Sequence, residues 1–165
     1  MVKKYKVGIV PGSFDPITVG HLDIIRRAAE LCETVFVAVM INADKEYRFT
    51  LDERREIAEA ACKEFENVKV ISSSGMLYAL AESLSAEVII KGVRNGRDRE
   101  YELEMARFNE EKYPLAKTLL LDANESLSSV SSTLVREIMA RGEDFSDYIS
   151  QQSLEIINKI KKSSK

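Results

Sequence analysis

The run at residues 35–41, VFVAVMI, is apolar at every position, whereas a strand with one solvent-exposed face would alternate apolar and polar residues. A strand of this kind is buried on both faces, which is the situation in a parallel sheet covered by helices on each side. Similar strand-like runs occur at residues 7–10, 68–72, 88–91 and 118–122. Amphipathic stretches predict helices at residues 20–33, 51–65, 76–84, 100–112, 131–141 and 151–162.

The alternation of strand and helix defines the expected fold class. It predicts an α/β protein with a doubly wound, Rossmann-like parallel sheet of five strands, helices on both faces and two further helices at the C-terminus. A chain of 165 residues that is 45% hydrophobic is the size of one domain and can bury a sizeable core. We therefore predict a single domain over residues 1–165.

The balance of charged residues limits the kinds of molecule that the protein is expected to bind. With 24 lysine and arginine residues against 27 aspartate and glutamate residues, the chain has a formal net charge of -3. A general DNA- or RNA-binding protein needs a basic surplus, because neutralised phosphates supply most of its non-specific affinity. The sequence also shows neither a signal region before the first strand nor an apolar run long enough to cross a bilayer. We therefore expect neither nucleic acid nor a membrane among its partners.

The two cysteines, Cys32 and Cys62, each fall in a helical pattern without metal-ligand residues nearby. Such cysteines are typically small core residues with free thiols. Free thiols fit a reducing compartment, so we predict a cytoplasmic protein.

Residues 11–21, PGSFDPITVGH, join the first strand to the first helix and contain the only histidine of the chain. In an open α/β sheet such a turn lies at the carboxyl ends of the strands, where ligands bind. The helix that follows offers unpaired N–H groups and a partial positive charge to a phosphate. Thr18, Gly20 and His21 add a hydroxyl, a close approach to the backbone and an imidazole. These features predict a nucleotide-phosphate site.

Several common fingerprints do not occur in the sequence. Gly8, Gly12 and Gly20 do not form G-x-G-x-x-G, and no segment matches G-x-x-x-x-G-K-[ST]. No G-x-S-x-G elbow exposes a serine nucleophile, and no cluster of His, Cys or carboxylate residues predicts a built-in metal site. Paired-carboxylate hydrolysis and Ser-His-Asp acyl transfer therefore both fit poorly.

The motifs as a group resemble those of the bacterial phosphopantetheine adenylyltransferases, within the nucleotidyltransferase superfamily. Thr18-Val19-Gly20-His21 is similar to the [HT]-x-G-H signature of the superfamily. Further matching segments follow in the order of the narrower family, at residues 49–54, 91–94, 98–102 and 130–136. The resemblance covers nearly the whole chain.

This resemblance implies a reaction. AMP would pass from ATP to 4'-phosphopantetheine, which gives 3'-dephospho-coenzyme A and pyrophosphate in coenzyme A synthesis. No covalent enzyme intermediate is implied, so catalysis reduces to positioning two anions in line and stabilising the transition state. His21 is the expected transition-state donor. Magnesium is expected to arrive with ATP, held mainly by phosphate oxygens and water.

The resemblance also implies ligand contacts, residue by residue. For 4'-phosphopantetheine they are Ser13, Lys45, Leu77 and Lys91. For ATP they are Ser13, Phe14, His21, Gly92, Val93, Arg94, Glu102, Leu127, Ser128, Ser129, Val130, Ser131, Ser132 and Thr133. The hydroxyl-rich segment in this set leads into a predicted helix, whose first N–H groups suit the β- and γ-phosphates. Arg136, one turn on, either adds charge to the site or lies on the helix surface.

The chain departs from the usual family pattern at three positions. Lys91 stands where the family commonly has arginine, so a point charge replaces planar bidentate phosphate binding. Arg99 and Leu127 stand where many members carry an aromatic residue, so stacking is not expected there.

Two alternatives stay open from the sequence. One is a sister nucleotidyltransferase that uses nicotinate mononucleotide or a cytidylyl donor, although such enzymes typically carry histidine at the position of Thr18. The other is a non-catalytic nucleotide-binding or sensor protein. The resemblance further implies a homohexamer built from two trimers and feedback binding of coenzyme A.

Overall fold

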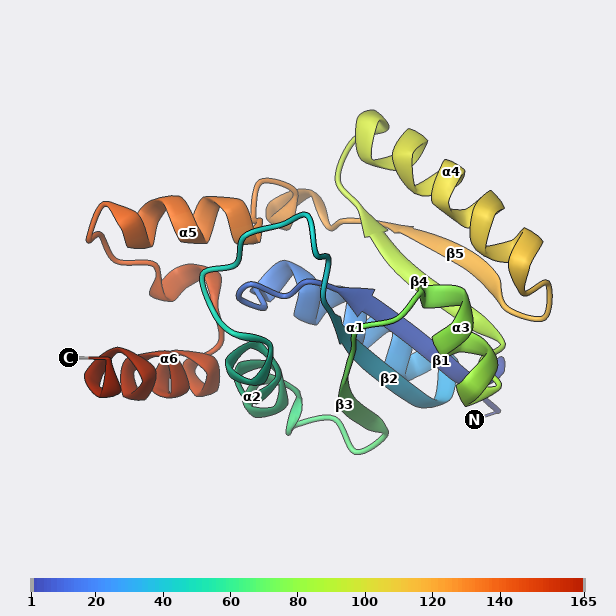
Figure 1. Cartoon of the computed structure of the whole chain (residues 1–165), viewed down its shortest axis with the longest axis horizontal. Helices are drawn as coiled ribbons and strands as arrows, with labels where there is room; N and C mark the ends of the chain where they lie inside the picture. The colour runs from blue at the N-terminus through green and yellow to red at the C-terminus, as the bar shows by residue number, and fades with distance from the viewer. Residues whose placement is uncertain (1, 165) are drawn as a thin grey trace.

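A computed structural model describes residues 2–164. Its parallel strands form one sheet in the order β3-β2-β1-β4-β5, with helices packed against it (Figure 1). The strands are β1 (Tyr5–Gly12), β2 (Cys32–Met40), β3 (Val68–Ser73), β4 (Val88–Val93) and β5 (Lys117–Asp122). The helices are α1 (Val19–Leu31), α2 (Leu51–Cys62), α3 (Leu77–Leu84), α4 (Gly96–Lys112), α5 (Ser132–Ala140) and α6 (Gln151–Ser163), with short 3-10 turns η1 (Glu125–Leu127) and η2 (Ser146–Tyr148). The predicted five-stranded parallel α/β fold is confirmed; the predicted domain also includes residues 1 and 165, which lie outside the described part.

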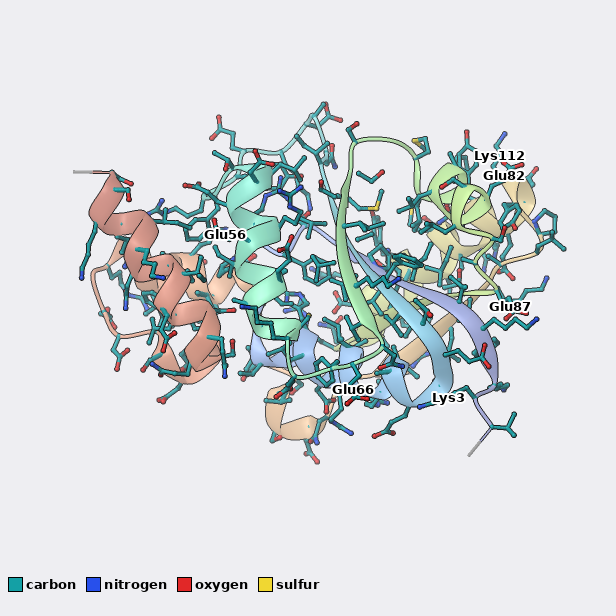
Figure 2. The ribbon with its side chains drawn as sticks, turned by 90° about the horizontal axis from the view of Figure 1, so that it is seen from below. Lys3, Glu56, Glu66, Glu82, Glu87 and Lys112 are labelled. Carbon is teal, nitrogen blue, oxygen red and sulfur yellow. The ribbon has the colours of Figure 1, made fainter. Side chains whose placement is uncertain are left out.

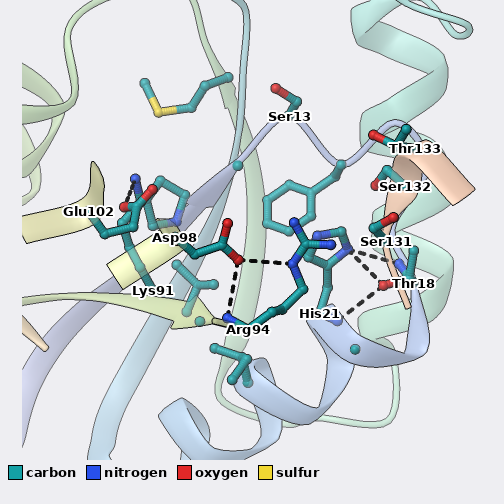
Figure 3. A pocket seen from close by; sticks show the side chains of 18 of the residues that line it. Ser13, Thr18, His21, Lys91, Arg94, Asp98, Glu102, Ser131, Ser132 and Thr133 are labelled. Atoms are coloured by element: carbon teal, nitrogen blue, oxygen red, sulfur yellow. Dashed lines mark hydrogen bonds and ion pairs between the residues drawn. The ribbon is translucent and has the colours of Figure 1, made fainter. Parts of the chain in front are cut away.

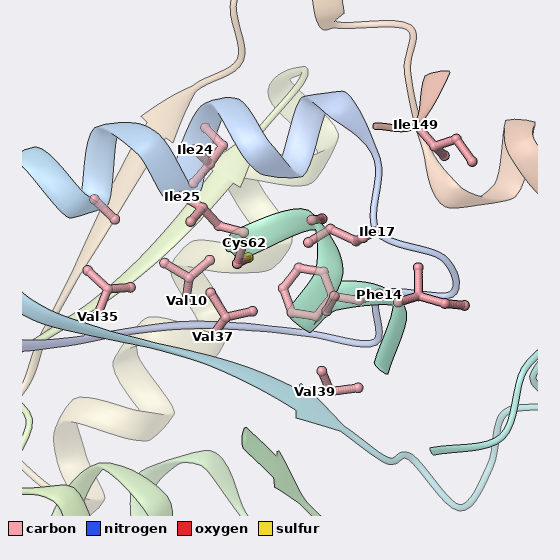
Figure 4. Close-up of a cluster of buried hydrophobic side chains, with 14 of the residues drawn as sticks. Val10, Phe14, Ile17, Ile24, Ile25, Val35, Val37, Val39, Cys62 and Ile149 are labelled. Atoms are coloured by element: carbon pink, nitrogen blue, oxygen red, sulfur yellow. The ribbon is translucent and has the colours of Figure 1, made fainter. Parts of the chain in front are cut away.

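The two faces of the sheet carry separate clusters of buried side chains, because successive strand residues point to opposite sides. On β1, Val10 belongs to the larger cluster, to which α1, α2, α5 and α6 contribute, whereas Ile9 packs in a smaller cluster with α3. On β2, Val37 and Ala38 divide in the same way. Figure 4 shows part of the larger cluster, with Ile25 of α1 facing the sheet. Burial on both faces therefore explains the continuous apolar runs of the sequence.

The strand order places a crevice beside β1. This central strand pairs with β2 on one side and with β4 on the other. The connection after β1 leads toward β2, whereas the connection after β4 leads to β5 at the opposite edge. Connections that diverge in this way open a crevice at the carboxyl ends of the strands, where open α/β sheets bind ligands.

Several element boundaries differ from the sequence prediction by up to four residues, and two of these differences have a local explanation. Helix α1 ends one residue before Cys32, so the prediction of Cys32 in a helix is wrong: it begins β2. The helix passes into the strand without a loop, and a buried thiol suits either element, so the apolar spacing did not reveal the boundary. Helix α4 begins at Gly96 rather than at residue 100, because the Asn95 side chain caps it by accepting the Asp98 N–H at 2.9 Å.

Apart from Asp15 and Arg54, which are buried, the charged side chains of residues 2–164 are partly or fully exposed. Figure 2 shows Glu56, Glu82 and Lys112 projecting away from the ribbon, and all three are exposed. Within residues 2–164, no helix has both the length and the apolar character that a membrane crossing would need.

Candidate active site

A cleft of about 620 Å³ opens at the carboxyl ends of β1 and β4. It brings together residues predicted for the acceptor side and for the ATP side, although they come from segments far apart in the sequence. The predicted residues that line it are Ser13, Phe14, His21, Lys45, Leu77, Lys91, Gly92, Arg94, Glu102, Leu127, Val130, Ser131, Ser132 and Thr133. The crevice expected from the strand order is therefore also where most of the predicted site residues meet.

Phe14 anchors the loop of residues 11–21. Its backbone is left-handed, with a φ of 47°, and its side chain is buried. Gly12 leaves room for this ring, since a Cβ at that position would lie 3.0 Å from it. The ring meets the imidazole of His21 edge to face, with centroids 5.0 Å apart and an interplanar angle of 77°. The loop thus holds the histidine against a buried aromatic side chain.

The first turn of α1 fixes the orientation of His21. The Thr18 hydroxyl accepts the His21 backbone N–H at 3.3 Å, and the Thr18 backbone N–H donates to His21 Nδ1 at 3.0 Å (Figure 3). This is a capping box in which an imidazole replaces the usual Glu or Gln side chain. A backbone N–H can only donate, so Nδ1 accepts and the proton of the neutral ring is on Nε2. His21 therefore presents an N–H donor on the side opposite its cap.

The surroundings of His21 keep this ring neutral. Burial, the larger cause, and the positive charge of Arg94 together lower the pKa of His21 from 6.5 to about 4. At neutral pH the imidazole is therefore an uncharged hydrogen-bond donor at the start of a helix, where N–H groups and the helix dipole also favour an anion.

The low pKa of His21 should make stability depend on pH. Between pH 6.5 and about 4 the unfolded chain binds a proton at this ring and the folded chain does not, so acidification through this range lowers the free energy of unfolding. We expect a loss on the order of 2 kcal/mol, reduced by solvent screening in the open cleft. Urea unfolding of wild type and His21→Gln at pH 7 and pH 4.5 measures it, because glutamine does not titrate. An identical pH dependence in the two proteins would contradict the prediction.

Two cations on β4 and the turn after it each meet a carboxylate of α4. The Arg94 backbone N–H and its Nε both donate to Asp98 Oδ2, at 3.2 and 3.0 Å (Figure 3). Lys91 Nζ lies 2.6 Å from Glu102 Oε2, an ion pair without the alignment of a hydrogen bond. The carboxylates hold both cationic groups at the cleft, where either can face an anion.

The start of α5 is docked onto the loop of residues 11–21. Ser131 caps the helix, and the Ser132 hydroxyl donates to the Pro16 carbonyl at 2.8 Å. Arg136 donates to the Asp15 carbonyl at 2.9 Å and also lines the cleft. Of the two possibilities for Arg136, the structure therefore favours a charge at the site over a surface helix residue.

Three residues predicted for the ATP side do not line the cleft. The Val93 side chain is buried in the core, although its neighbours Gly92 and Arg94 do line the cleft. The Ser128 hydroxyl donates to the Glu125 carbonyl in η1. Ser129 is exposed and is not among the residues that line the cleft. In a strand or a tight turn adjacent side chains point in different directions, so a contiguous motif does not place every member at the ligand.

Several cleft residues were absent from the predicted set. Asp98 follows Arg94 by four positions at the start of a helix, a spacing that could have indicated their contact. Tyr101 and Met105 also line the cleft from α4, at helical spacing from Asp98. Arg54 ends the matching segment at residues 49–54 but was assigned to neither ligand; it does not line the cleft, and its guanidinium donates to backbone carbonyls.

Comparisons with known proteins show the family of the chain. The model of the cytidylyltransferase-like family matches residues 9–138. A phosphopantetheine adenylyltransferase of Alkaliphilus metalliredigens is 44% identical over 93% of the chain and 98% of its own length. One from Heliobacterium modesticaldum is 41% identical over 87% of the chain and 85% of its length, and one from Lachnoclostridium phytofermentans is 37% identical over 92% and 93%.

A solved structure supports the fold. A protein of Vibrio parahaemolyticus, described as a putative nicotinate-nucleotide adenylyltransferase, superposes with a TM-score of 0.65 over 94% of this chain and 99% of its own, at 21% identity. At that identity the likeness concerns the fold alone, whereas the sequence relatives extend over nearly the whole chain. The chain belongs to the phosphopantetheine adenylyltransferases of the cytidylyltransferase-like family.

Proposed function

We propose that this protein transfers the adenylyl group of ATP to 4'-phosphopantetheine, forming 3'-dephospho-coenzyme A and pyrophosphate. The name of the curated relatives supports the substrates. The observation that carries the chemistry is the neutral imidazole of His21, whose free N–H points away from its helix cap beside the Arg94 charge. This arrangement suits a phosphate that gains negative charge during reaction.

The reaction needs no nucleophile from the protein. An oxygen of the 4'-phosphate forms a bond to the α-phosphorus of ATP, while the bond from that phosphorus to the bridging oxygen breaks and pyrophosphate leaves with the electron pair. His21 Nε2–H would donate to an α-phosphate oxygen as its charge grows. The rest of the rate enhancement would come from holding the two anions in line.

The two substrates divide the cleft between them in this proposal. Ser13, Lys45 and Lys91 would hold the 4'-phosphate, and Leu77 would contact the pantetheine arm. Arg94 and the start of α5 would hold the phosphates of ATP, where the first N–H groups of the helix favour anions.

Magnesium would enter as part of the MgATP substrate. Within residues 2–164, no group of three or more His, Cys, Asp or Glu side chains is arranged to hold a metal ion. Phosphate oxygens and water are the ligands that magnesium prefers in nucleotide sites. A homohexamer of two trimers, feedback binding of coenzyme A and a cytoplasmic location complete the proposal; the two buried, free cysteines support the location.

An assay of product formation tests the proposed substrates. Incubation with ATP, magnesium and 4'-phosphopantetheine should release pyrophosphate and yield dephospho-coenzyme A. Nicotinate mononucleotide in place of 4'-phosphopantetheine is the matched control and should yield no product. Product from nicotinate mononucleotide alone would assign the chain to the sister activity, and no product from either acceptor would favour a non-catalytic nucleotide-binding protein.

A further inference from the structure

Arg54 is a buried charge that pairs with carbonyls. It lies on α2 and is only 1% exposed, yet its guanidinium makes no hydrogen bond to a carboxylate among the described residues. It donates instead to the backbone carbonyls of Ser13 at 2.8 Å, Met40 at 3.0 Å and Phe49 at 3.3 Å. Burial lowers the pKa of Arg54, the direction expected when a cation leaves water.

The three carbonyls lie at defined points of the chain. Residues 41–49 form a loop between β2 and α2, which we call the acceptor loop. Met40, the last residue of β2, directly precedes this loop, and Phe49 is its last residue. Ser13 follows β1 and belongs to the loop that leads to His21. One guanidinium therefore closes the base of the acceptor loop and ties it to the loop that bears Ser13.

Arg54 also supports the interior of the acceptor loop. Its guanidinium stacks 3.9 Å from the centroid of the Tyr47 ring. The Tyr47 hydroxyl in turn accepts the Asn42 backbone N–H at 2.7 Å, and Lys45 N–H donates to the Asn42 carbonyl at 3.0 Å. The position of Lys45 thus depends on contacts that lead back to Arg54.

A guanidinium is suited to this arrangement and an ammonium is not. Arginine presents five N–H donors in a rigid plane and can also stack on an aromatic ring, whereas lysine is a compact point charge. Burying a charge has a desolvation cost that largely offsets its hydrogen bonds, so the main effect of Arg54 is to fix the relative positions of its partners rather than to add net stability.

We propose that Arg54 is a positioning residue for the acceptor phosphate, holding Lys45 and Ser13 at the separation that the 4'-phosphate requires. The proposal rests on the proposed function, because that function places the 4'-phosphate between these two residues. It implies that loss of Arg54 weakens the acceptor side more than the ATP side, whose phosphates are assigned to Arg94 and the start of α5.

Steady-state kinetics of Arg54→Lys and Arg54→Met test the inference. We expect KM for 4'-phosphopantetheine to rise about 10-fold or more, because small displacements of positioning groups are costly, while KM for ATP changes less than about 3-fold. Arg55→Met is the matched control, since Arg55 is the next residue of α2 and pairs at the surface with Asp52 and Glu59. It should leave both KM values within about 2-fold of wild type. Equal increases in both KM values, or no increase in either, would overturn the proposal.

Limited trypsin digestion provides a readout that does not depend on the substrate. Trypsin cleaves after Lys45 and Arg48 of the acceptor loop, and cleavage there should accelerate in Arg54→Met and not in Arg55→Met. If wild type yields no dephospho-coenzyme A, the proposed function fails, and digestion alone decides whether Arg54 orders the loop. If the Arg54 variants do not fold, Tyr47→Leu replaces them, with the same split in KM and faster cleavage expected. Unchanged cleavage in every folded variant overturns the role of Arg54.

Discussion

Replacing His21 with alanine should lower kcat about 10²- to 10³-fold, the usual loss when one preorganised donor to a developing charge is removed. The effect should fall on kcat rather than on KM, because a neutral donor strengthens most as charge shifts onto the α-phosphate oxygens. Stopped assays of pyrophosphate release at saturating ATP and 4'-phosphopantetheine measure it. A kcat near that of wild type would remove His21 from the mechanism.

The matched variant for His21 is His21→Gln. Glutamine at the third helical position can complete the Thr18 capping box through its side-chain oxygen, as glutamine does in other helices. It should therefore restore the thermal stability that alanine loses, without restoring kcat to the wild-type value. Recovery of kcat in parallel with stability would show that the cap, and not the Nε2 donor, limits the reaction.

Replacing Arg94 with methionine should lower kcat/KM for ATP by about 10²-fold, because charge-assisted contacts to phosphate are the strong ones. KM for 4'-phosphopantetheine should change less, since the proposed acceptor contacts come from other residues. Arg97→Met is the control, because Arg97 lies three residues further on, in the first turn of α4, is exposed and does not line the cleft. Equal losses in the two variants would mean that general electrostatic attraction, rather than a contact of Arg94, sets the ATP affinity.

Arg94→Met has a second consequence that is independent of turnover. The charge of Arg94 contributes to the low pKa of His21, so its removal should raise that pKa from about 4 toward the ordinary value. The shift should be partial, because burial is the larger cause and remains in the variant. His21 is the only histidine, so its ring signals in an NMR titration are unambiguous. A pKa equal to that of wild type would show that the two groups do not interact.

The sequence predicted the fold well, because the strongest determinants are local and periodic. Burial on both faces makes the runs of β1 and β2 continuously apolar, and each run could be recognised by itself. Boundaries were less predictable where one element passes directly into the next, as at Cys32. The early start of α4 depends on a single Asn95 cap before a strongly charged stretch, so hydrophobic periodicity could not detect it.

The sequence predicted those site residues that belong to a recognisable motif. It missed those that only the fold brings to the site. The resemblance indicated His21, Lys91 and Arg94 as ligand contacts, and these residues meet at one cleft. Arg54 lies in the matching segment at residues 49–54, but its contacts could not be predicted, because a backbone carbonyl acceptor can belong to any residue type. Which side chains of a motif point into the cleft also depends on the course of the backbone, which the motif does not give. Val93, which is buried, is an example.

The imidazole cap of α1 links the stability of the helix start to the protonation of the His21 ring. The same bond from the Thr18 N–H to Nδ1 completes the first turn of the helix and determines which ring nitrogen keeps its proton. Any change that loosens the helix start therefore also frees the tautomer and orientation of the reacting donor. As long as His21 is retained, the stability of the first turn of α1 and the orientation of the donor change together, so a screen for thermostable substitutions at the neighbouring residues would also select for an intact donor.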